Sequence, residues 1–383
     1  MTLFEYHNPV RLVFGCGQLA MVGKIARQHG GKALIVTSGS SARTGLLDRV
    51  VGYLKEEGLE VVVYGKIAAN PLTTMALEAA ALARSEKCDV VIGLGGGSSM
   101  DAAKATAFMA VNEGDINEYI FGKPGVGALP SIMITTTAGT GSEGNCAAVL
   151  TNPETHDKKA IRSPFNYPKA SIIDPELLTT LSKGSIAGPG LDALFHAIES
   201  YISQKGNPMT DMFCLQAIAL LAENLPAVYD DSSNLAAWEK VVFANTLAGM
   251  AIDATATTLA HGMEHPVSGL FDVAHGEGLA ALFLPTMKFA CRQVPQKFAM
   301  IAKAMGTDIK NMTIEAAAEK SIELVGALIA RVNMVRKLRD FGVTQEHLDW
   351  LTANAFKTMK FVIDNNPRVP SPAEVKEIYR DSL

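Results

Sequence analysis

Residues 89–98 read Asp-Val-Val-Ile-Gly-Leu-Gly-Gly-Gly-Ser, and this stretch decides the fold. An apolar run that ends in three glycines predicts a buried strand and a tight turn, and residues 100–112 predict a helix after it. Glycines let the backbone approach a bulky anion, and a helix N-terminus offers that anion N–H groups and a partial positive charge. The stretch therefore predicts a phosphate-binding strand–turn–helix unit, although an ordinary glycine-rich turn has the same pattern.

Similar patterns repeat on both sides of this unit. Strands are predicted at 33–37, 60–64 and 131–135, and helices at 45–58 and 73–86. Strands that alternate with helices indicate a parallel sheet with helices on both faces.

The chain changes character at about residue 185, where helical patterns take over. Helices are expected at 191–203, 211–223, 238–254, 314–332 and 345–356. We therefore expect an α/β domain at residues 1–184 and an all-helical domain at 185–383, joined through the glycine- and proline-containing segment 184–190.

The composition excludes several classes of protein. The 383 residues carry a formal net charge of -5 and no basic run, which disfavours nucleic acid and anionic membranes as partners. The five cysteines are far apart and odd in number, so neither a disulfide framework nor a cysteine zinc cluster is expected. The first nine residues hold no apolar run, and no uncharged apolar stretch reaches the roughly 18 residues of a membrane span. These features predict a cytoplasmic protein.

Two further loops follow predicted strands. Residues 135–143 read Thr-Thr-Thr-Ala-Gly-Thr-Gly-Ser-Glu and come after the strand 131–135, while Asn70-Pro71 comes after the strand 60–64. Open α/β sheets bind ligands at the carboxyl ends of their parallel strands. The hydroxyl-rich loop is thus a candidate ligand site, with a solvated turn as the alternative.

Histidines gather in the helical half. Asp192 and His196 lie four residues apart, as do His261 and His265, and His275 follows ten residues later. Residues four apart share one face of a helix. One such pair is often a coincidence, but two pairs with a further histidine favour a metal site. One carboxylate with three imidazoles suits Fe²⁺ or Zn²⁺ rather than Ca²⁺ or Mg²⁺.

With these motifs in place, the sequence resembles the iron-containing (group III) alcohol dehydrogenases, which include lactaldehyde, propanediol and butanol dehydrogenases. The likeness covers the whole chain. It is carried by Phe14-Gly15, the glycine loop at Gly95, the segments 136–143, 190–199 and 261–280, and the C-terminal Asn366-Pro367-Arg368, Pro370 and Ile378-Tyr379-Arg380.

The resemblance implies a metal-dependent enzyme that moves a hydride between a nicotinamide cofactor and a small alcohol or aldehyde, and that forms a homodimer or larger assembly. It implies metal ligands at Asp192, His196, His261 and His275, and a catalytic histidine beside them at His265. It implies dinucleotide contacts in the α/β domain, at Asn70, Gly96, Gly97, Ser98, Asp101, Thr136, Thr137, Thr140 and Lys159.

Two departures from the family pattern are expected to reshape the substrate pocket without touching the metal set. Glu264 stands where many members have alanine, although butanol-type members also carry glutamate, and Gly144-Asn145-Cys146 replaces a more usual Val-Thr segment. Three other functions stay open: a polyol dehydrogenase, a dehydroquinate-synthase-like lyase and a non-catalytic dinucleotide- or metal-binding sensor.

The segment after the strand 33–37 bears on the choice of dinucleotide. NAD-preferring members of the family commonly have an aspartate here, whereas this chain has Ser38, Gly39, Ser40 and Ser41, with Arg43 beyond. Hydroxyls and a cation suit the 2′-phosphate of NADP, which an aspartate would repel. We therefore expect NADP to be preferred over NAD, with a turn that merely lost its acid as the alternative.

Overall fold

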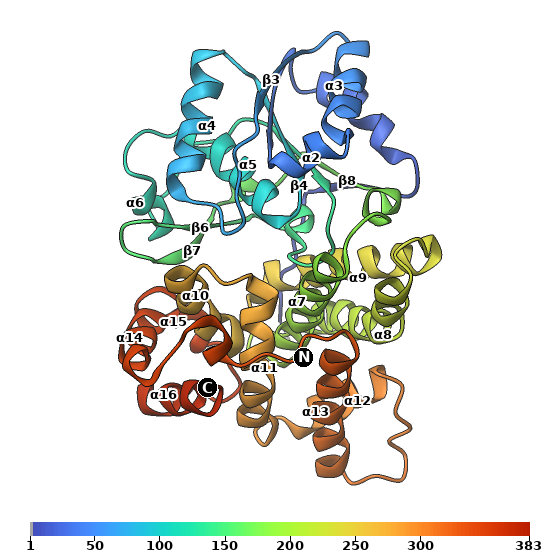
Figure 1. The fold of residues 1–383 in the computed structure, drawn as a ribbon, viewed down its shortest axis with the longest axis vertical. Coiled ribbons are helices and arrows are strands. Elements are labelled where there is room, and N and C mark those ends of the chain that lie inside the picture. Colours follow the sequence, from blue (N-terminus) through green and yellow to red (C-terminus); the bar gives the residue numbers. More distant parts are fainter. Residues whose placement is uncertain (1–2) are drawn as a thin grey trace. The chain divides into compact units, whose positions relative to one another are not determined.

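The computed structural model describes residues 3–383, so Met1 and Thr2 lie outside the described residues. The chain forms two compact units (Figure 1), which are described separately below. An α/β unit comprises residues 8–137 and 141–179, and a helical unit comprises the segment up to His7, the short stretch 138–140 and residues 180–383.

The α/β unit is built on a six-stranded sheet in the order β1-β8-β5-β4-β2-β3. Every pair of neighbouring strands is parallel, as expected from the alternating strand and helix patterns. The strands are β1 (Arg11–Phe14), β2 (Lys32–Thr37), β3 (Glu60–Tyr64), β4 (Val90–Gly95), β5 (Ser131–Thr135) and β8 (Ala170–Ile173).

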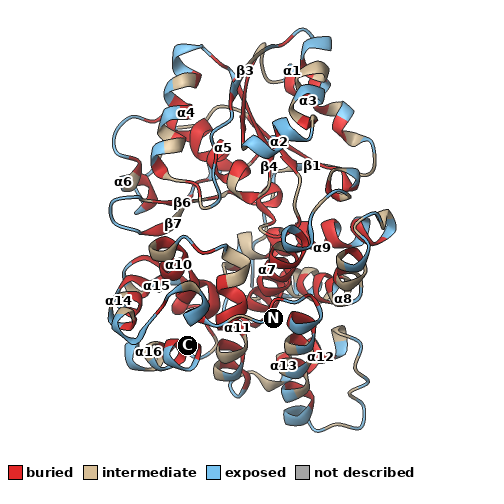
Figure 2. Ribbon diagram, in the orientation of Figure 1, coloured by how far each residue is buried: buried red, intermediate tan, exposed pale blue. Residues whose placement is uncertain are grey.

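Helices cover both faces of this sheet, because successive strand residues point to opposite sides. Ala33 and Ile35 pack with α1 (Val22–Arg27) and α3 (Leu46–Glu56). Leu34 and Val36 pack instead with two helices on the other face, α4 (Thr73–Ser85) and α5 (Gly97–Met109). The inner strands β2, β4, β5 and β8 are buried almost throughout, in contrast to the edge strands β1 and β3, and this explains their nearly continuous apolar sequences (Figure 2).

An antiparallel hairpin was not among the predicted elements. It consists of β6 (Ala147–Thr151) and β7 (Lys158–Arg162). Its second strand begins with two lysines, a residue type that is depleted in strands, so the sequence pattern hides it. The unit is completed by short helices: η1 (Gln18–Met21), α2 (Gly39–Arg43), α6 (Ile116–Ile120), η2 (Ser142–Gly144), η3 (Pro164–Asn166) and η4 (Pro175–Leu178).

The helical unit has no strand within residues 180–383. Helices α7, α8 and α9 pack on one another, α10 packs on α11, and α12 packs on α13. A second core joins α10 and α11 to α14 and α16. The helices are α7 (Lys183–Ile202), α8 (Pro208–Asp230), α9 (Leu235–Thr255), α10 (Leu259–Phe271), α11 (His275–Cys291), α12 (Pro295–Ala304), α13 (Ile314–Arg331), α14 (Leu348–Thr358), α15 (Lys360–Ile363) and α16 (Pro372–Asp381), with the short η5 (Leu338–Phe341) and η6 (Gln345–His347).

The prediction of a connecting segment at 184–190 was wrong. This segment is helical, because α7 begins at Lys183, after Ser182 caps it by accepting a hydrogen bond from the Ser185 N–H, and continues through Pro189. Gly190 serves packing rather than a turn. A Cβ atom at position 190 would lie 2.2 Å from Leu225 Cδ1, so only glycine lets α7 approach α8 this closely.

Helix α8 is the one described helix long and apolar enough to cross a membrane by length and composition. This is weak evidence, since a core helix of a water-exposed domain passes the same test. Helix α8 packs along α7 and α9 and buries Cys214, Ile218, Leu221 and Leu225 in the helical unit.

The glycine at position 93 provides a test of the sheet packing. A Cβ at Gly93 would lie 2.7 Å from Met133 Sδ and 2.9 Å from Ala103 Cβ, so Gly93→Ala should lower the free energy of unfolding by about 1–3 kcal/mol. Gly52 in α3 is the matched control. It has no atom within 4 Å of a new Cβ, so Gly52→Ala should instead stabilise the protein by about 0.4–1 kcal/mol. Chemical denaturation measures both, and equal stability of the two variants would contradict the close approach of α5 to the sheet.

Candidate metal centre and phosphate-binding loop

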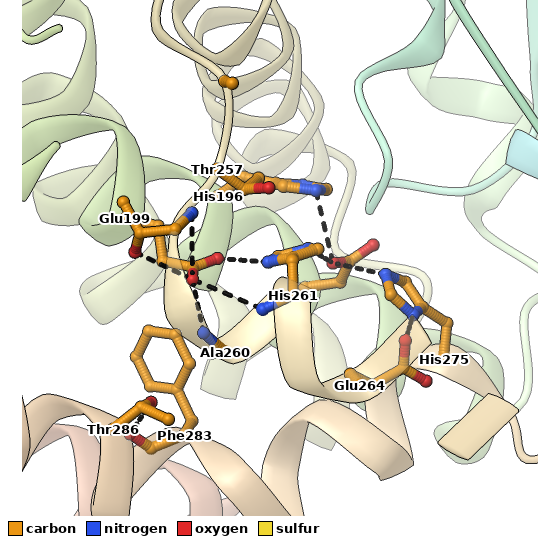
Figure 3. Close-up of polar contacts among 12 residues, drawn as sticks. His196, Glu199, Thr257, Ala260, His261, Glu264, His275, Phe283 and Thr286 are labelled. Atoms are coloured by element: carbon orange, nitrogen blue, oxygen red, sulfur yellow. Dashed lines mark hydrogen bonds and ion pairs between the residues drawn. The ribbon is translucent and has the colours of Figure 1, made fainter. Parts of the chain in front are cut away.

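Three imidazoles converge on one carboxylate oxygen in the helical unit. Asp192 Oδ1 lies 3.6 Å from His196 Nε2, 3.4 Å from His261 Nε2 and 3.7 Å from His275 Nε2. Helix α7 provides Asp192 and His196, α10 provides His261, and α11 provides His275. Figure 3 shows the three rings turned toward a common point.

Asp192, His261 and His275 form a donor group that fits a single divalent ion, whereas His196 meets only the criterion of lying 3.6 Å from the same Asp192 oxygen. Four donors placed tetrahedrally at about 2.0–2.1 Å from an ion lie about 3.4 Å apart, close to the spacing of Asp192 Oδ1 from each imidazole. Asp192 Oδ1 and His261 Nε2 are buried and have no hydrogen-bond partner, which is costly unless something else satisfies them. Asp192, His261 and His275 also form a group whose donor atoms all lie within 4.8 Å of one another.

The second ring nitrogen of each of these three histidines meets an oxygen. His261 Nδ1 pairs with the Glu199 carboxylate, His275 Nδ1 pairs with Glu264, and His196 Nδ1 lies 3.2 Å from the Gly139 carbonyl. An acceptor at Nδ1 places the ring proton there and leaves Nε2 free as a metal ligand. The three contacts therefore orient the imidazoles for binding.

Buried carboxylates make this centre favourable for positive charge. Burial opposes ionisation of Asp192, but the surrounding His196, His275 and His261 hold the pKa of its carboxyl well below its usual range. Burial also works against a charged His261, yet Glu199 and Asp192 raise its pKa to about 10. Burial lowers the pKa of His196 to about 4, which keeps that ring neutral and available as a ligand.

His265 lies beside the convergent set. Its ring centre is 5.6 Å from that of His275 and 6.4 Å from that of His261. It is buried, and one of its ring nitrogens lies within 4.8 Å of a Glu264 carboxylate oxygen and of a His275 ring nitrogen. The imidazole of His265 therefore lies directly beside two of the proposed metal ligands, His261 and His275.

Two acidic residues of this site were not assigned correctly from the sequence. Glu199 was missed, although its spacing from Asp192 and His196 is i, i+4, i+7 and so predicts one helix face. Glu264 was expected to leave the metal set untouched, and this was wrong, because it is fully buried and bonds to His275 Nδ1. A sequence cannot tell which way a glutamate on a buried helix points.

In the α/β unit, the glycine loop has the predicted form. Helix α5 begins at Gly97, with Gly96 as its N-cap, so no side chain covers its free N–H groups. Gly95 has φ +145°, a conformation that favours glycine. A Cβ at Gly96 would lie 2.8 Å from Thr137 Oγ1, so the loop lies directly against the hydroxyl-rich segment. Gly96, Gly97, Ser98, Thr136 and Thr137 thus line one open helix N-terminus.

Loop residues 138–140 belong to the helical unit, where Gly139 packs on Pro189 and meets His196. Thr140 is part of this short stretch.

Asn70 accepts a hydrogen bond from Lys158, the neighbour of the predicted dinucleotide contact Lys159. Lys158 is buried in β7 and its Nζ donates to Asn70 Oδ1 at 3.0 Å. Lys159, one residue on, faces the other side, with Nζ 5.0 Å from the centre of the Phe121 ring. Asn70 itself has φ 48°, an uncommon conformation ahead of a proline. The geometry favours Lys158 over Lys159 as the cation nearest this loop.

Asp101 points into the protein. Its carboxylate accepts hydrogen bonds from Ser142 Oγ and, at 3.0 Å, from the Val149 N–H, and lies 4.0 Å from Lys104 Nζ. Burial raises the pKa of Asp101 in spite of these partners. Lys104 is fully buried and also donates to Ser142, Asn145 and the Ala147 carbonyl. Asp101 and Lys104 therefore connect α5 to the β6–β7 hairpin. Lys104 also bonds to Asn145, which lies in the segment 144–146 that departs from the family pattern.

The segment after β2 forms the short helix α2, with Ser38 at the N-cap position and no hydrogen bond from its side chain to the helix. The hydroxyls of Ser38 and Ser40 lie 2.7 Å apart and are accessible, whereas Ser41 is buried and accepts from Thr37 Oγ1 at 2.9 Å. Arg43 folds back, with Nη1 3.2 Å from the position of a Cβ on Gly39. Two hydroxyls and one guanidinium are therefore clustered here.

Comparison with known proteins identifies the family. Residues 9–175 match the model for "Iron-containing alcohol dehydrogenase", and residues 186–383 match that for "Fe-containing alcohol dehydrogenase family, C-terminal". The chain belongs to the iron-containing alcohol dehydrogenase family, and it is an NAD(P)-dependent alcohol/aldehyde oxidoreductase. The lyase and the non-catalytic sensor are thereby set aside.

Several relatives match along their whole length. The chain is 36% identical to 1,3-propanediol dehydrogenase of Klebsiella pneumoniae, over 100% of this chain and 99% of the relative. It is 32% identical to NAD-dependent methanol dehydrogenase of Bacillus methanolicus, over 99% and 100% of the two chains. A crystal structure of 1,3-propanediol oxidoreductase superposes with a TM-score of 0.94 at 36% identity and 100% coverage of both chains.

Asp101→Ala is expected to destabilise the protein rather than merely weaken dinucleotide binding. Removing one partner of a buried charge pair should lower the free energy of unfolding on the order of 3 kcal/mol, since Lys104 stays buried. Ser98→Ala is the control, because Ser98 is only half-buried and its loss should change stability by less than about 0.5 kcal/mol. Thermal denaturation and dinucleotide KM separate the two effects. Wild-type stability with a raised KM in Asp101→Ala would instead support direct cofactor contact.

Proposed function

We propose that Asp192, His196, His261 and His275 together hold one divalent ion, Fe²⁺ in the natural enzyme. The observation that carries this proposal is the convergence of three Nε2 atoms on Asp192 Oδ1, each ring backed by an acceptor at Nδ1. Three imidazoles and one carboxylate suit a borderline divalent ion, so Zn²⁺ is the alternative occupant.

The dinucleotide is proposed to bind at the open N-terminus of α5. Gly96, Gly97 and Ser98 suit its pyrophosphate, because backbone N–H groups and the helix dipole favour an anion there. Thr136, Thr137 and Asn70 add polar groups, and Lys158 adds a buried cation beside Asn70. Thr140, Asp101 and Lys159 stay predicted dinucleotide contacts.

The reaction follows from these parts. A divalent ion held by these side chains would supply Lewis acidity toward an alcohol hydroxyl, and a bound nicotinamide dinucleotide would supply the hydride chemistry. Glu199, Glu264 and Gly139 keep the three imidazole rings aligned throughout. His265 is proposed to relay the hydroxyl proton, since an imidazole titrates near neutrality and this one lies next to His275.

The substrate class is proposed to be a small primary alcohol or its aldehyde. The relatives named as propanediol and methanol dehydrogenases act on small alcohols. A homodimer or larger assembly and a cytoplasmic location stay predictions, as do the domain limits 1–184 and 185–383.

Separate alanine substitutions of His261 and His265 distinguish a metal ligand from a proton relay. His261→Ala should lose the ion and all turnover, because three donors hold it far more weakly than four. His265→Ala should keep the ion but lower kcat by about 10²–10⁴-fold and alter the pH profile. Metal analysis and steady-state kinetics on an alcohol panel check both. Full metal and activity in His261→Ala would contradict the site, and metal loss in His265→Ala would make His265 a ligand.

NADP(H) is the proposed preferred dinucleotide, since Ser38, Ser40 and Arg43 offer hydroxyls and a cation to a 2′-phosphate, with no carboxylate between Thr37 and Asp48. Ser38→Asp should shift the ratio of kcat/KM values toward NAD(H), because the new carboxylate repels the phosphate. Ser41→Ala is the control and should leave the ratio unchanged, since Ser41 is buried. A clear preference of the wild-type enzyme for NADH on one aldehyde would contradict the proposal.

A further inference from the structure

We propose that Glu264 is a positioning residue that governs how fast the metal centre loses its ion, through its hold on His275. This inference rests on the proposed metal site and extends it to the residue that retains the ion.

His275 is the most exposed of the four proposed ligands. Its side chain is 22% exposed, against 7% for His196, 3% for His261 and 5% for Asp192. A chelator or water therefore reaches His275 first, and release of the ion should begin there.

The backbone points to the same ligand. His275 is the first residue of α11, whereas Asp192 and His196 lie well inside α7. His261 lies in the first turn of α10, where Glu199 Oε1 also accepts from the N–H groups of Thr258 and Ala260. His275 follows a turn in which Asp272 has φ 52°. Its ring therefore depends on side-chain contacts to stay in place.

Glu264 provides such a contact, and its own side chain is held in place by its neighbours. Its carboxylate is fully buried in α10, where one oxygen bonds to His275 Nδ1 and the other meets Ser268 Oγ (Figure 3 shows the first of these contacts). A Cβ on Gly278 would lie 2.7 Å from Glu264 Oε1, so the glycine in α11 leaves the space that the carboxylate fills. The arrangement fixes the orientation of Glu264, and Glu264 fixes the ring.

Loss of this contact should act on retention of the ion. Replacing the partner of a ligating histidine typically lowers metal affinity by about 10–100-fold. The four donors themselves remain, so we expect the change mainly in the release rate.

The experiment loads the full-length protein with Zn²⁺, adds excess EDTA, and follows release of the metal over time. Glu264→Gln should release Zn²⁺ about 10–100-fold faster than wild type. Glu277→Gln is the matched control. Glu277 lies two residues from His275 on α11 and undergoes the same charge change, but it pairs with Arg336 at 3.2 Å and should leave release unchanged. The visible spectrum of the Co²⁺-loaded protein adds a readout of ligand geometry, which should change only in Glu264→Gln.

The outcomes are distinct. Wild-type release from Glu264→Gln overturns the inference, as does a metal-free protein whose Tm falls in step with faster release, since that indicates a general packing role. Two ions in the wild-type chain and one in Glu264→Gln would make Glu264 a ligand, which also overturns it. If Glu264→Gln does not fold, Ser268→Ala must show faster release than wild type. A wild-type protein that binds no divalent ion refutes the proposed metal site itself.

Discussion

The helical unit depends on one electrostatic requirement, which is that three imidazole nitrogens must face the same buried oxygen of Asp192. Without a cation this arrangement leaves polar atoms unsatisfied, and burial makes such atoms costly. Carboxylates and a backbone carbonyl behind the rings fix their direction. Glu199 binds both the His261 ring and the first N–H groups of α10.

Close helix packing brings these groups together. Gly190 lets α7 lie against α8, and Gly278 makes room for Glu264 between α10 and α11. Gly276 approaches the Gly188 carbonyl so closely that a Cβ would lie 2.4 Å from the oxygen. Small residues at these crossings place the ligand-bearing faces of α7 and α11 within reach of each other. The arrangement of the proposed metal centre thus depends on glycines at the helix crossings as well as on the side chains of the site.

The α/β unit offers a binding site for an anion without using a charged side chain. No charged side chain belongs to the glycine loop, and the N-terminus of α5 provides the positive end of a dipole instead. Two lysines of this unit make different contacts. Lys104 lies beside Asp101 and donates to the hairpin, while Lys158 donates a hydrogen bond to Asn70. Alternation along β7 puts Lys158 and Lys159 on opposite sides, so that Lys158 meets Asn70 and Lys159 lies over the Phe121 ring.

The sequence alone predicted the parallel sheet, the helical second half, the glycine loop and a group of one aspartate and four histidines as metal-site candidates, while the family resemblance set His265 apart from the other four. These follow from periodicity, from glycine runs and from spacing along a helix, all of which are local properties. Only the tertiary structure showed that 184–190 is helical, that Asp101 faces Lys104, and that Glu199 and Glu264 stand behind the histidines. Those facts depend on which neighbour a buried side chain meets, and that neighbour is distant in the chain or on another helix. Spacing predicts which residues share a face, whereas packing decides what that face touches.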